Sequence, residues 1–123
     1  MKRSNKRNRG FTLVEILIVV VILGILAAIV VPQFTNAADD ARTGNLDTQI
    51  STIEQQIELF RARTGAYPTF DATLWTTLVT GGYLKTAPVN PINGGSDVGA
   101  DGSGASWEIY TDANGNAVVE SGV

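Results

Sequence analysis

An apolar run near the N-terminus constrains this chain more than any other feature. Residues 16–31 read ILIVVVILGILAAIVV, sixteen consecutive positions without a polar side chain. Extended back to Phe11, the run covers 21 residues and is interrupted only by Thr12 and Glu15. Because an α-helix rises about 1.5 Å per residue, such a run spans the roughly 30 Å hydrocarbon core of a bilayer. We therefore expect a membrane-spanning helix.

Charge is distributed very unevenly around this run. Five of the nine basic residues lie in the first ten positions, where there is no acidic residue: Lys2, Arg3, Lys6, Arg7 and Arg9. The other 113 residues hold four basic and all twelve acidic side chains. The positive-inside rule predicts that the leader stays in the cytoplasm and that the chain after Val31 lies across the membrane. Clustered Lys and Arg are needed to bind phosphates, so the acidic part predicts no nucleic-acid partner.

The composition also bears on catalysis. The chain of 123 residues contains no histidine and no cysteine. Ser-His and Cys-His nucleophile systems, His or Cys metal sites, and disulfides are therefore excluded. The sequence also has no phosphate-binding glycine loop. We expect a protein that is not an enzyme.

The apolar run has three interpretations. It is a secretory signal peptide cut near Thr35-Asn36-Ala37, a plain single-span anchor, or an anchor with a more specific N-terminal signal. A signal peptide rarely has so long an apolar core. A plain anchor does not explain Glu15, because an ionisable group inside hydrocarbon is costly without a partner.

The third interpretation depends on the residues at the junction of the leader and the run. The stretch Arg9–Glu15, RGFTLVE, resembles the class III signal of type IV pilins and type II secretion pseudopilins. The resemblance implies that a prepilin peptidase cuts between Gly10 and Phe11 on the cytoplasmic side and methylates the new amine of Phe11. It also implies that Glu15 neutralises the Phe11 amine of an adjacent subunit and so aligns the incoming protomer.

Beyond the apolar run, the pattern predicts that the helix continues to about Thr64. One apolar stripe follows helical spacing: Leu46, Ile50, Ile53, Ile57 and Phe60. Gly65 and Pro68 are typical of the chain just after a helix end. Pro32, together with poor helix formers in residues 35–45, predicts a kink or a melted segment between about residues 24 and 36.

The remaining residues predict a small head that covers this stripe. Asp71 is expected to cap a short helix over residues 72–80, and residues 86–105 are expected to form a loop rich in glycine and proline. Trp107 and Ile109 then alternate with polar residues before a turn at Asn114-Gly115 and a second strand, which predicts a β-hairpin. The fold class is α+β, with a long N-terminal helix packed against a small antiparallel sheet. The expected parts are a leader (1–10), a filament-core helix (11–35), an amphipathic continuation (36–64) and a head (65–123).

The sequence establishes no cofactor with certainty, and calcium is the one candidate. Asp112 and Asn114 place oxygen atoms at alternate positions, and Asp97 and Asp101 add carboxylates in the preceding loop. The resemblance implies calcium because the ion is a familiar stabiliser of the major pseudopilin of type II secretion. A hairpin turn explains Asp112 and Asn114 without any ion, so both interpretations stay open.

The family resemblance is closest to the major pseudopilin of type II secretion. It implies a homo-oligomeric filament subunit that is inserted in the inner membrane with its head in the periplasm, and that polymerises for protein secretion. The implied partners are the prepilin peptidase, an inner-membrane assembly platform and a motor ATPase, and the assembled fibre lies in the periplasm or at the cell surface. The alternatives are a type IV pilin for adhesion or motility, which the lack of cysteine disfavours, and a single-span membrane-anchored binding protein.

Overall fold

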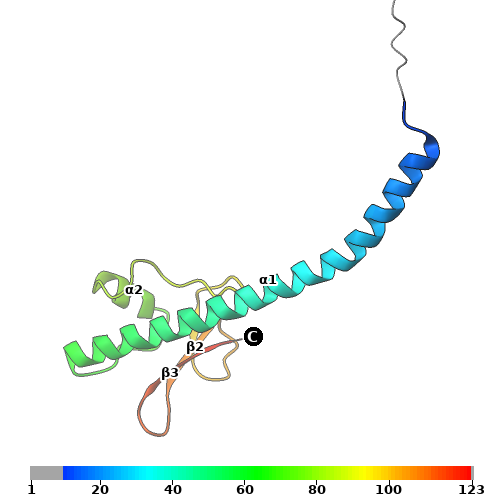
Figure 1. Cartoon of the computed structure of the whole chain (residues 1–123). Helices are drawn as coiled ribbons and strands as arrows, with labels where there is room; N and C mark the ends of the chain where they lie inside the picture. The colour runs from blue at the N-terminus through cyan, green and yellow to red at the C-terminus, as the bar shows by residue number, and fades with distance from the viewer. Residues whose placement is uncertain (1–9, 123) are drawn as a thin grey trace, which may run out of the picture. The chain divides into compact units, whose positions relative to one another are not determined.

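A computed structural model describes residues 10–122, so the five cations of the leader lie outside the described residues. The chain forms two compact units that divide between Ala38 and Asp39. The elements follow in the order α1 (Leu13–Thr64), α2 (Leu74–Thr80), β1 (Val98–Gly99), β2 (Trp107–Thr111) and β3 (Ala117–Ser121) (Figure 1). The predicted α+β class and the long N-terminal helix are confirmed.

The N-terminal unit consists of the first part of α1, which is a single apolar helix. Within the described residues, this is the one helix long and apolar enough to cross a membrane. The large apolar side chains between Leu13 and Val31 are all between 42% and 86% exposed. No part of residues 10–122 covers these side chains, so this surface requires lipid or other protein.

Pro32 lies inside α1 without ending it. The helix is continuous from Leu13 to Thr64, so the melted segment predicted between residues 24 and 36 is absent from the single chain. Proline removes one backbone hydrogen bond, but the bonds of the neighbouring turns are kept. Thr35 donates its hydroxyl to the carbonyl of Val31 (3.2 Å), which gives that carbonyl a second donor.

The second unit is a head built around the C-terminal part of α1. Ile53 and Ile57 are almost completely buried, as their place in the predicted stripe requires. Full burial of such a side chain stabilises a fold by about 1.5–3 kcal/mol. They share one core with residues of α2, β2 and β3: Leu74, Trp75, Leu78, Trp107, Ile109 and Val119. Trp75 and Trp107 meet edge to face, with ring centroids 6.5 Å apart.

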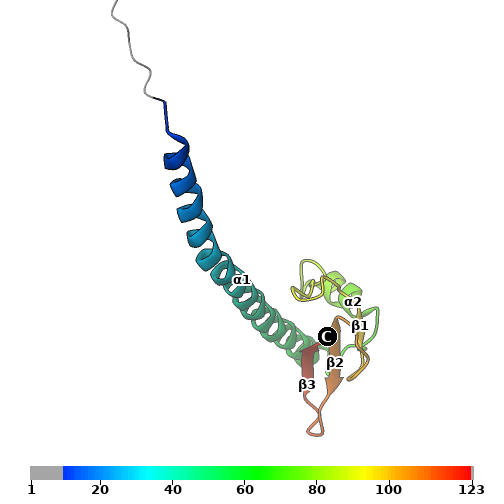
Figure 2. The same ribbon diagram turned by 90° about the vertical axis from the view of Figure 1, so that its right-hand side faces the viewer.

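The head sheet has three strands in the order β1-β2-β3 (Figure 2). β2 and β3 form the predicted hairpin, with Ile109 opposite Val119. β1 pairs with β2 in parallel, so the sheet is mixed and the prediction of a purely antiparallel sheet was wrong. The parallel ladder joins only Val98 to Trp107 and Gly99 to Glu108, which is too short to produce a strand pattern in the sequence.

Two polar residues of the head differ from their predicted roles. Asp71 does not cap α2 itself. Its carboxylate accepts hydrogen bonds from the backbone N–H (2.8 Å) and the hydroxyl (2.6 Å) of Thr73, which forms an Asx turn before the helix. Glu108 was expected on the face opposite Trp107, yet only 8% of its surface is exposed. The backbone N–H groups of Gly102 and Gly104 donate to its carboxylate (3.1 and 2.7 Å), and these bonds make its burial tolerable.

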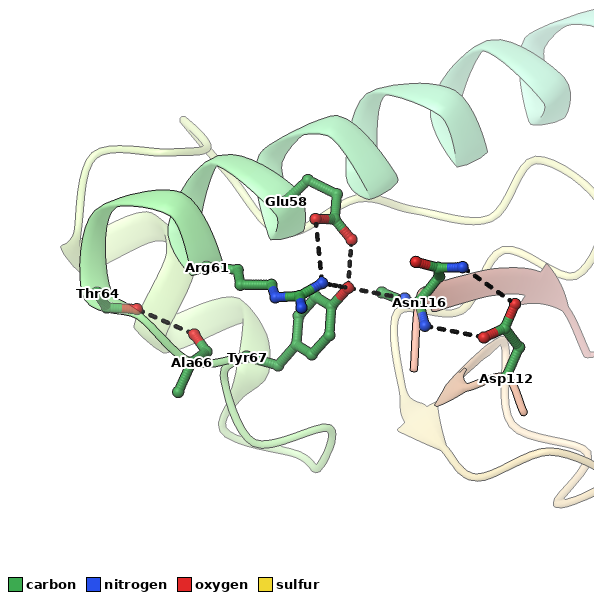
Figure 3. A network of polar contacts seen from close by, with 8 residues as sticks. Glu58, Arg61, Thr64, Ala66, Tyr67, Asp112 and Asn116 are labelled. Carbon is green, nitrogen blue, oxygen red and sulfur yellow. Dashed lines mark hydrogen bonds and ion pairs between the residues drawn. The ribbon is translucent and has the colours of Figure 1, made fainter. Parts of the chain in front are cut away.

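The outer edge of the sheet is covered by side chains from α1 and the segment after it. The backbone N–H of Ala117 in β3 donates to the hydroxyl of Tyr67 (3.1 Å), and that of Val119 donates to Glu54 (3.4 Å). Figure 3 shows the Tyr67 hydroxyl between Glu58, to which it donates, and Arg61, which donates to it (2.8 Å). These two side chains occupy N–H groups of the edge strand and leave less of the edge open to pairing.

Candidate functional site

The N-terminus of α1 is defined by two reciprocal hydrogen bonds. The backbone N–H of Thr12 donates to Oε2 of Glu15 (2.8 Å), and the backbone N–H of Glu15 donates to Oγ1 of Thr12 (3.2 Å). The carbonyl of Thr12 accepts the first helical bond, from Ile16 (3.3 Å). Thr12 is therefore the N-cap residue and Glu15 the third helical residue of a capping box, in which each satisfies one backbone N–H that the helix leaves without a partner.

This arrangement gives Glu15 a partner that sequence reasoning missed. The apolar run by itself leaves Glu15 without a partner, and the family resemblance implies a partner only on an adjacent subunit. The signal was present, because a threonine followed three residues later by a glutamate and an apolar run is the pattern of a capping box. The negative charge also lies in the first turn of the helix, where the positive end of the helix dipole favours it.

The predicted processing residues lie just before the capping box. Gly10 and Phe11 precede the first helical residue, and both are exposed, Phe11 by 85%. The bond between them is therefore in an accessible, non-helical part of the chain. One copy contains no neighbouring Phe11 amine, so the pairing of Glu15 with another subunit stays a prediction.

Asp97, predicted as a calcium ligand, is bonded to the loop before β2. Its carboxylate accepts a hydrogen bond from the hydroxyl of Ser106 and another from the Ser106 backbone N–H (3.2 Å). The Ser106 hydroxyl, followed by the backbone N–H, lowers the pKa of Asp97 below its ordinary value. These bonds connect the chain just before β1 to the chain just before β2.

Asp112 and Asn114, predicted as further ligands, lie in the hairpin turn. The backbone N–H groups of Asn114 (2.9 Å) and Asn116 (2.8 Å) donate to one oxygen of Asp112, and the Asn116 bond is the largest cause of a lowered Asp112 pKa. Figure 3 shows Asp112 directed at Asn116. Gly115 has φ of +80°, which suits glycine in this turn. These hydrogen bonds give Asp112 a structural role in the turn.

A different set of carboxylates converges on the surface of the sheet. Carboxylate oxygens of Asp101, Glu108 and Glu120 lie within 4.8 Å of one another. Tyr110 has a raised pKa, because of partial burial and the nearby Glu120 carboxylate. Of the four residues predicted to bind calcium, only Asp101 belongs to this set, while Asp97 and Asp112 are engaged elsewhere. Calcium in the head stays a prediction.

Comparison with known proteins gives two family matches that together cover most of the chain. Residues 5–31 match the prokaryotic N-terminal methylation motif, and residues 33–112 match type II secretion system (T2SS), protein G. The first match includes Gly10, Phe11 and the capping box. The second includes the C-terminal part of α1 and the head as far as the hairpin turn.

Individual proteins similar to the chain include members of the same secretion family and a pilus component. The chain is 34% identical over 120 residues to type II secretion system core protein G of Pseudomonas aeruginosa, covering 88% of this chain and 84% of that protein. It is 32% identical over 123 residues to the protein of the same name in Vibrio cholerae, covering 90% and 83%. The type IV narrow pilus major component PilA5 of Thermus thermophilus is 38% identical over 65 residues, covering 53% and 56%. No solved structure matches the chain.

The bonds to Asp97 predict how acid affects the head. A carboxyl whose pKa is lowered by folding contributes stability above its unfolded value of about 4 and loses it as the pH falls through the folded value. We expect the Tm of the full chain in detergent micelles to fall between about pH 5 and pH 2, and Asp97→Asn to flatten part of this fall. Asp47→Asn, on the exposed surface of α1, is the matched control. If Tm falls with pH as steeply in Asp97→Asn as in the wild type, the hydrogen bonds to Asp97 do not stabilise the head.

Calcium removal tests the remaining cofactor prediction. If the head binds the ion, millimolar calcium raises the Tm of the full chain in micelles relative to a chelator, because a ligand of the folded state stabilises it by mass action. We expect a shift that Asp101→Asn abolishes, since Asp101 is the predicted ligand that lies beside other carboxylates. Asp97→Asn and Asp112→Asn then test the other predicted ligands. The same Tm in calcium and in chelator removes the ion from the description of this head.

Proposed function

The chain belongs to the type II secretion system protein G family, and we propose that it is the major structural subunit of a pseudopilus that serves protein secretion. A pseudopilus is a helical fibre made of many copies of one small subunit. The subunit carries out no chemistry of its own in this proposal. Its work consists of assembling and disassembling, and a separate motor ATPase supplies the energy.

The observation that carries the proposal is the uncovered apolar surface of α1. The side chains of Leu13–Val31 are exposed on every side of the helix, while the head of the same chain has a closed core. Such a helix is stable in lipid before assembly. In a fibre, the same surface packs against α1 of other copies, so a single feature accounts for both the membrane-inserted and the polymerised state.

Processing connects these two states. The methylation motif supports cleavage of the leader by a prepilin peptidase between Gly10 and Phe11, followed by methylation of the Phe11 amine. Removal of the leader deletes the five cations that hold the N-terminus on the cytoplasmic side. We place the subunit in the inner membrane with its head in the periplasm, and an assembly platform in the same membrane then receives it.

Within the fibre, we assign Glu15 to the amine of Phe11 on a neighbouring copy. Glu15 lies four residues after Phe11, which is about one helical turn. A neighbour displaced along the fibre by that amount would bring its amine level with the carboxylate. A charge pair in low dielectric is strong once formed, and an unpaired charge there is costly, so the pair selects one register.

A surface pilus is the second candidate. The 38% identity to a type IV pilus component favours it, although that match covers only 53% of the chain. The secretion proteins match over 88% and 90% of the chain, which favours the pseudopilus. A single-span binding protein accounts for an anchor and a head, but it gives no role to the cleavage site.

Processing predicts the mature N-terminus. Intact-mass analysis of protein extracted from membranes should give a chain that begins at Phe11 and carries one added methyl group. Gly10→Leu should block cleavage and leave the full leader in place, with the protein still in the membrane fraction. A wild-type chain that keeps its leader, or that begins near Ala38, contradicts the filament proposal.

The pairing of Glu15 predicts a defect confined to assembly. Glu15→Leu removes the charge from the apolar segment, so the subunit should stay in the membrane at wild-type levels. On docking, the Phe11 amine would lack its partner, and fibres counted by electron microscopy should be few or absent. Fractionation of the same cells is the control for insertion. Fibres of wild-type number and length would show that the alignment mechanism is wrong.

A further inference from the structure

The turn between β2 and β3 contains a reactive pair of residues to which the proposed function gives no role. Asn114 is followed by Gly115, and an asparagine before a glycine is able to lose its side-chain amide by reaction with its own backbone. We propose that Asn114 is a self-modification site, at which the head converts this asparagine to aspartate and isoaspartate at a rate set by Asp112. This chemistry does not depend on fibre formation.

The reaction needs only the chain and water. The backbone nitrogen of Gly115, after loss of its proton to hydroxide, attacks Cγ of Asn114. A bond forms between this nitrogen and Cγ, the bond from Cγ to the side-chain nitrogen breaks, and ammonia leaves with a proton taken from water. The product is a cyclic imide. Hydrolysis of the imide at the side-chain carbon gives aspartate, and hydrolysis at the main-chain carbon gives isoaspartate, whose backbone is longer by one carbon atom.

Most other asparagines among residues 10–122 lack a nucleophile for this reaction. Asn90 precedes Pro91, which has no backbone N–H. Asn116 precedes Ala117, whose backbone N–H donates to the hydroxyl of Tyr67 (3.1 Å). Two more lie inside α1, where the backbone N–H groups that follow them belong to helical hydrogen bonds: Asn36 and Asn45.

Asn93 is the other asparagine of the chain that is followed by a glycine, and it is also exposed. Both ends of its side chain are held. Its Oδ1 accepts the backbone N–H of Gly95 (3.0 Å), and its Nδ2 donates to the carbonyl of Gly122 (3.3 Å). The side chain must break both bonds before it reaches the nitrogen of Gly94. Asn93 is therefore a comparison within the same molecule, with the same dipeptide but a fixed side chain.

Asn114 is exposed in a turn that projects from the head (Figure 2). The backbone N–H of Asn116 is the largest cause of the lowered Asp112 pKa and the side-chain amide of Asn114 the smallest, so this amide is held only weakly. The N–H of Gly115 donates to the carbonyl of Asp112 (2.9 Å), so the turn must open before the nitrogen can react. A turn that contributes no residue to the core opens more readily than the core does.

Asp112 controls this opening. One oxygen of its carboxylate accepts the backbone N–H groups of Asn114 (2.9 Å) and Asn116 (2.8 Å), which lie on either side of the reactive nitrogen. While both bonds exist, the turn stays closed and the nitrogen of Gly115 stays bonded. Loss of the Asp112 carboxylate should therefore accelerate the reaction at Asn114 and leave Asn93 unaffected.

Either product changes the head. Aspartate at position 114 places a second carboxylate close to that of Asp112, and like charges at short distance repel. Isoaspartate lengthens the connection between two strands that end with Thr111 opposite Ala117. A looser connection lowers the stability of the head, because both strands contribute to its core: Trp107, Ile109 and Val119.

Ageing of the full chain in detergent micelles at mildly alkaline pH tests the proposal. Peptide mapping by mass spectrometry measures the amide lost at each asparagine, and an isoaspartyl methyltransferase with a labelled methyl donor counts isoaspartate. We expect loss at Asn114 to be about thirtyfold faster than at Asn93, the factor for two further hydrogen bonds of ordinary net strength. Asp112→Ala should accelerate the loss at Asn114 by about fivefold or more, because it removes the acceptor of two N–H groups.

Three matched variants serve as controls. Asn114→Gln keeps a side-chain amide but would have to close a larger ring, which forms far more slowly, so its Tm should not fall with ageing as the wild-type Tm does. Asn93→Gln should age like the wild type. Asp112→Asn keeps an oxygen that accepts the two N–H groups, and it should age more like the wild type than like Asp112→Ala.

The rates and their ratio decide the outcome. Equal loss at Asn93 and Asn114, faster loss at Asn93, or ageing that leaves no isoaspartate at position 114 overturns the site. An unchanged rate at Asn114 in Asp112→Ala overturns the role of Asp112. So does equal acceleration at Asn93 and Asn114 in that variant, since it reports a loosened head rather than an opened turn.

Discussion

The exposed apolar surface of α1 is the constraint on which the rest of this protein depends. A helix that is apolar all round for about five turns cannot remain in water, and no element among residues 10–122 covers it. In the function that we propose, lipid covers it first and other copies cover it later. Since lipid tails are as apolar as the helix, burial alone does not favour one state strongly. We therefore propose that a polar group at the N-terminus of the helix favours the assembled state.

Glu15 is the polar group to which we assign this role. The capping box makes an ionisable residue tolerable near hydrocarbon, because Glu15 satisfies a backbone N–H and lies at the positive end of the helix. It also fixes the first helical residue at Leu13. In the proposed function, removal of the leader creates a positively charged amine at Phe11, four residues before Glu15. Residues 10–15 would then contain both the cleavage site and the charge pair that sets the register.

The head uses the same helix in a different way. Ile53 and Ile57 add buried apolar side chains to the core that α2, β2 and β3 form. Glu54 and Tyr67 supply hydrogen-bond acceptors for the outer edge of β3. A domain of this size without disulfides has marginal stability, and packing on α1 stabilises it by enlarging its core. The helix stripe, the hairpin and its turn could be predicted from the sequence because each follows a local rule of spacing or turn chemistry.

Other features could not be read from local rules. The parallel pairing of β1 depends on two residues, and the burial of Glu108 depends on two glycine N–H groups that only the folded loop presents. α1 continues through Pro32 and through residues 35–45, so neither the proline nor the poor helix formers after it end the helix. The capping box does follow a local rule, because Thr12 is followed three residues later by Glu15. It could therefore have been predicted from the sequence.

Cryo-electron microscopy of fibres assembled from the cleaved chain tests the central claim most directly. If α1 is the polymerisation surface, the map should show residues 13–31 of neighbouring copies packed against one another, shielded from solvent, with the Glu15 carboxylate next to the Phe11 amine of another copy. Fibres held together by the heads alone, with residues 13–31 free of contact, would contradict the claim. So would a cleaved subunit that remains dispersed in the membrane while the secretion machinery is complete.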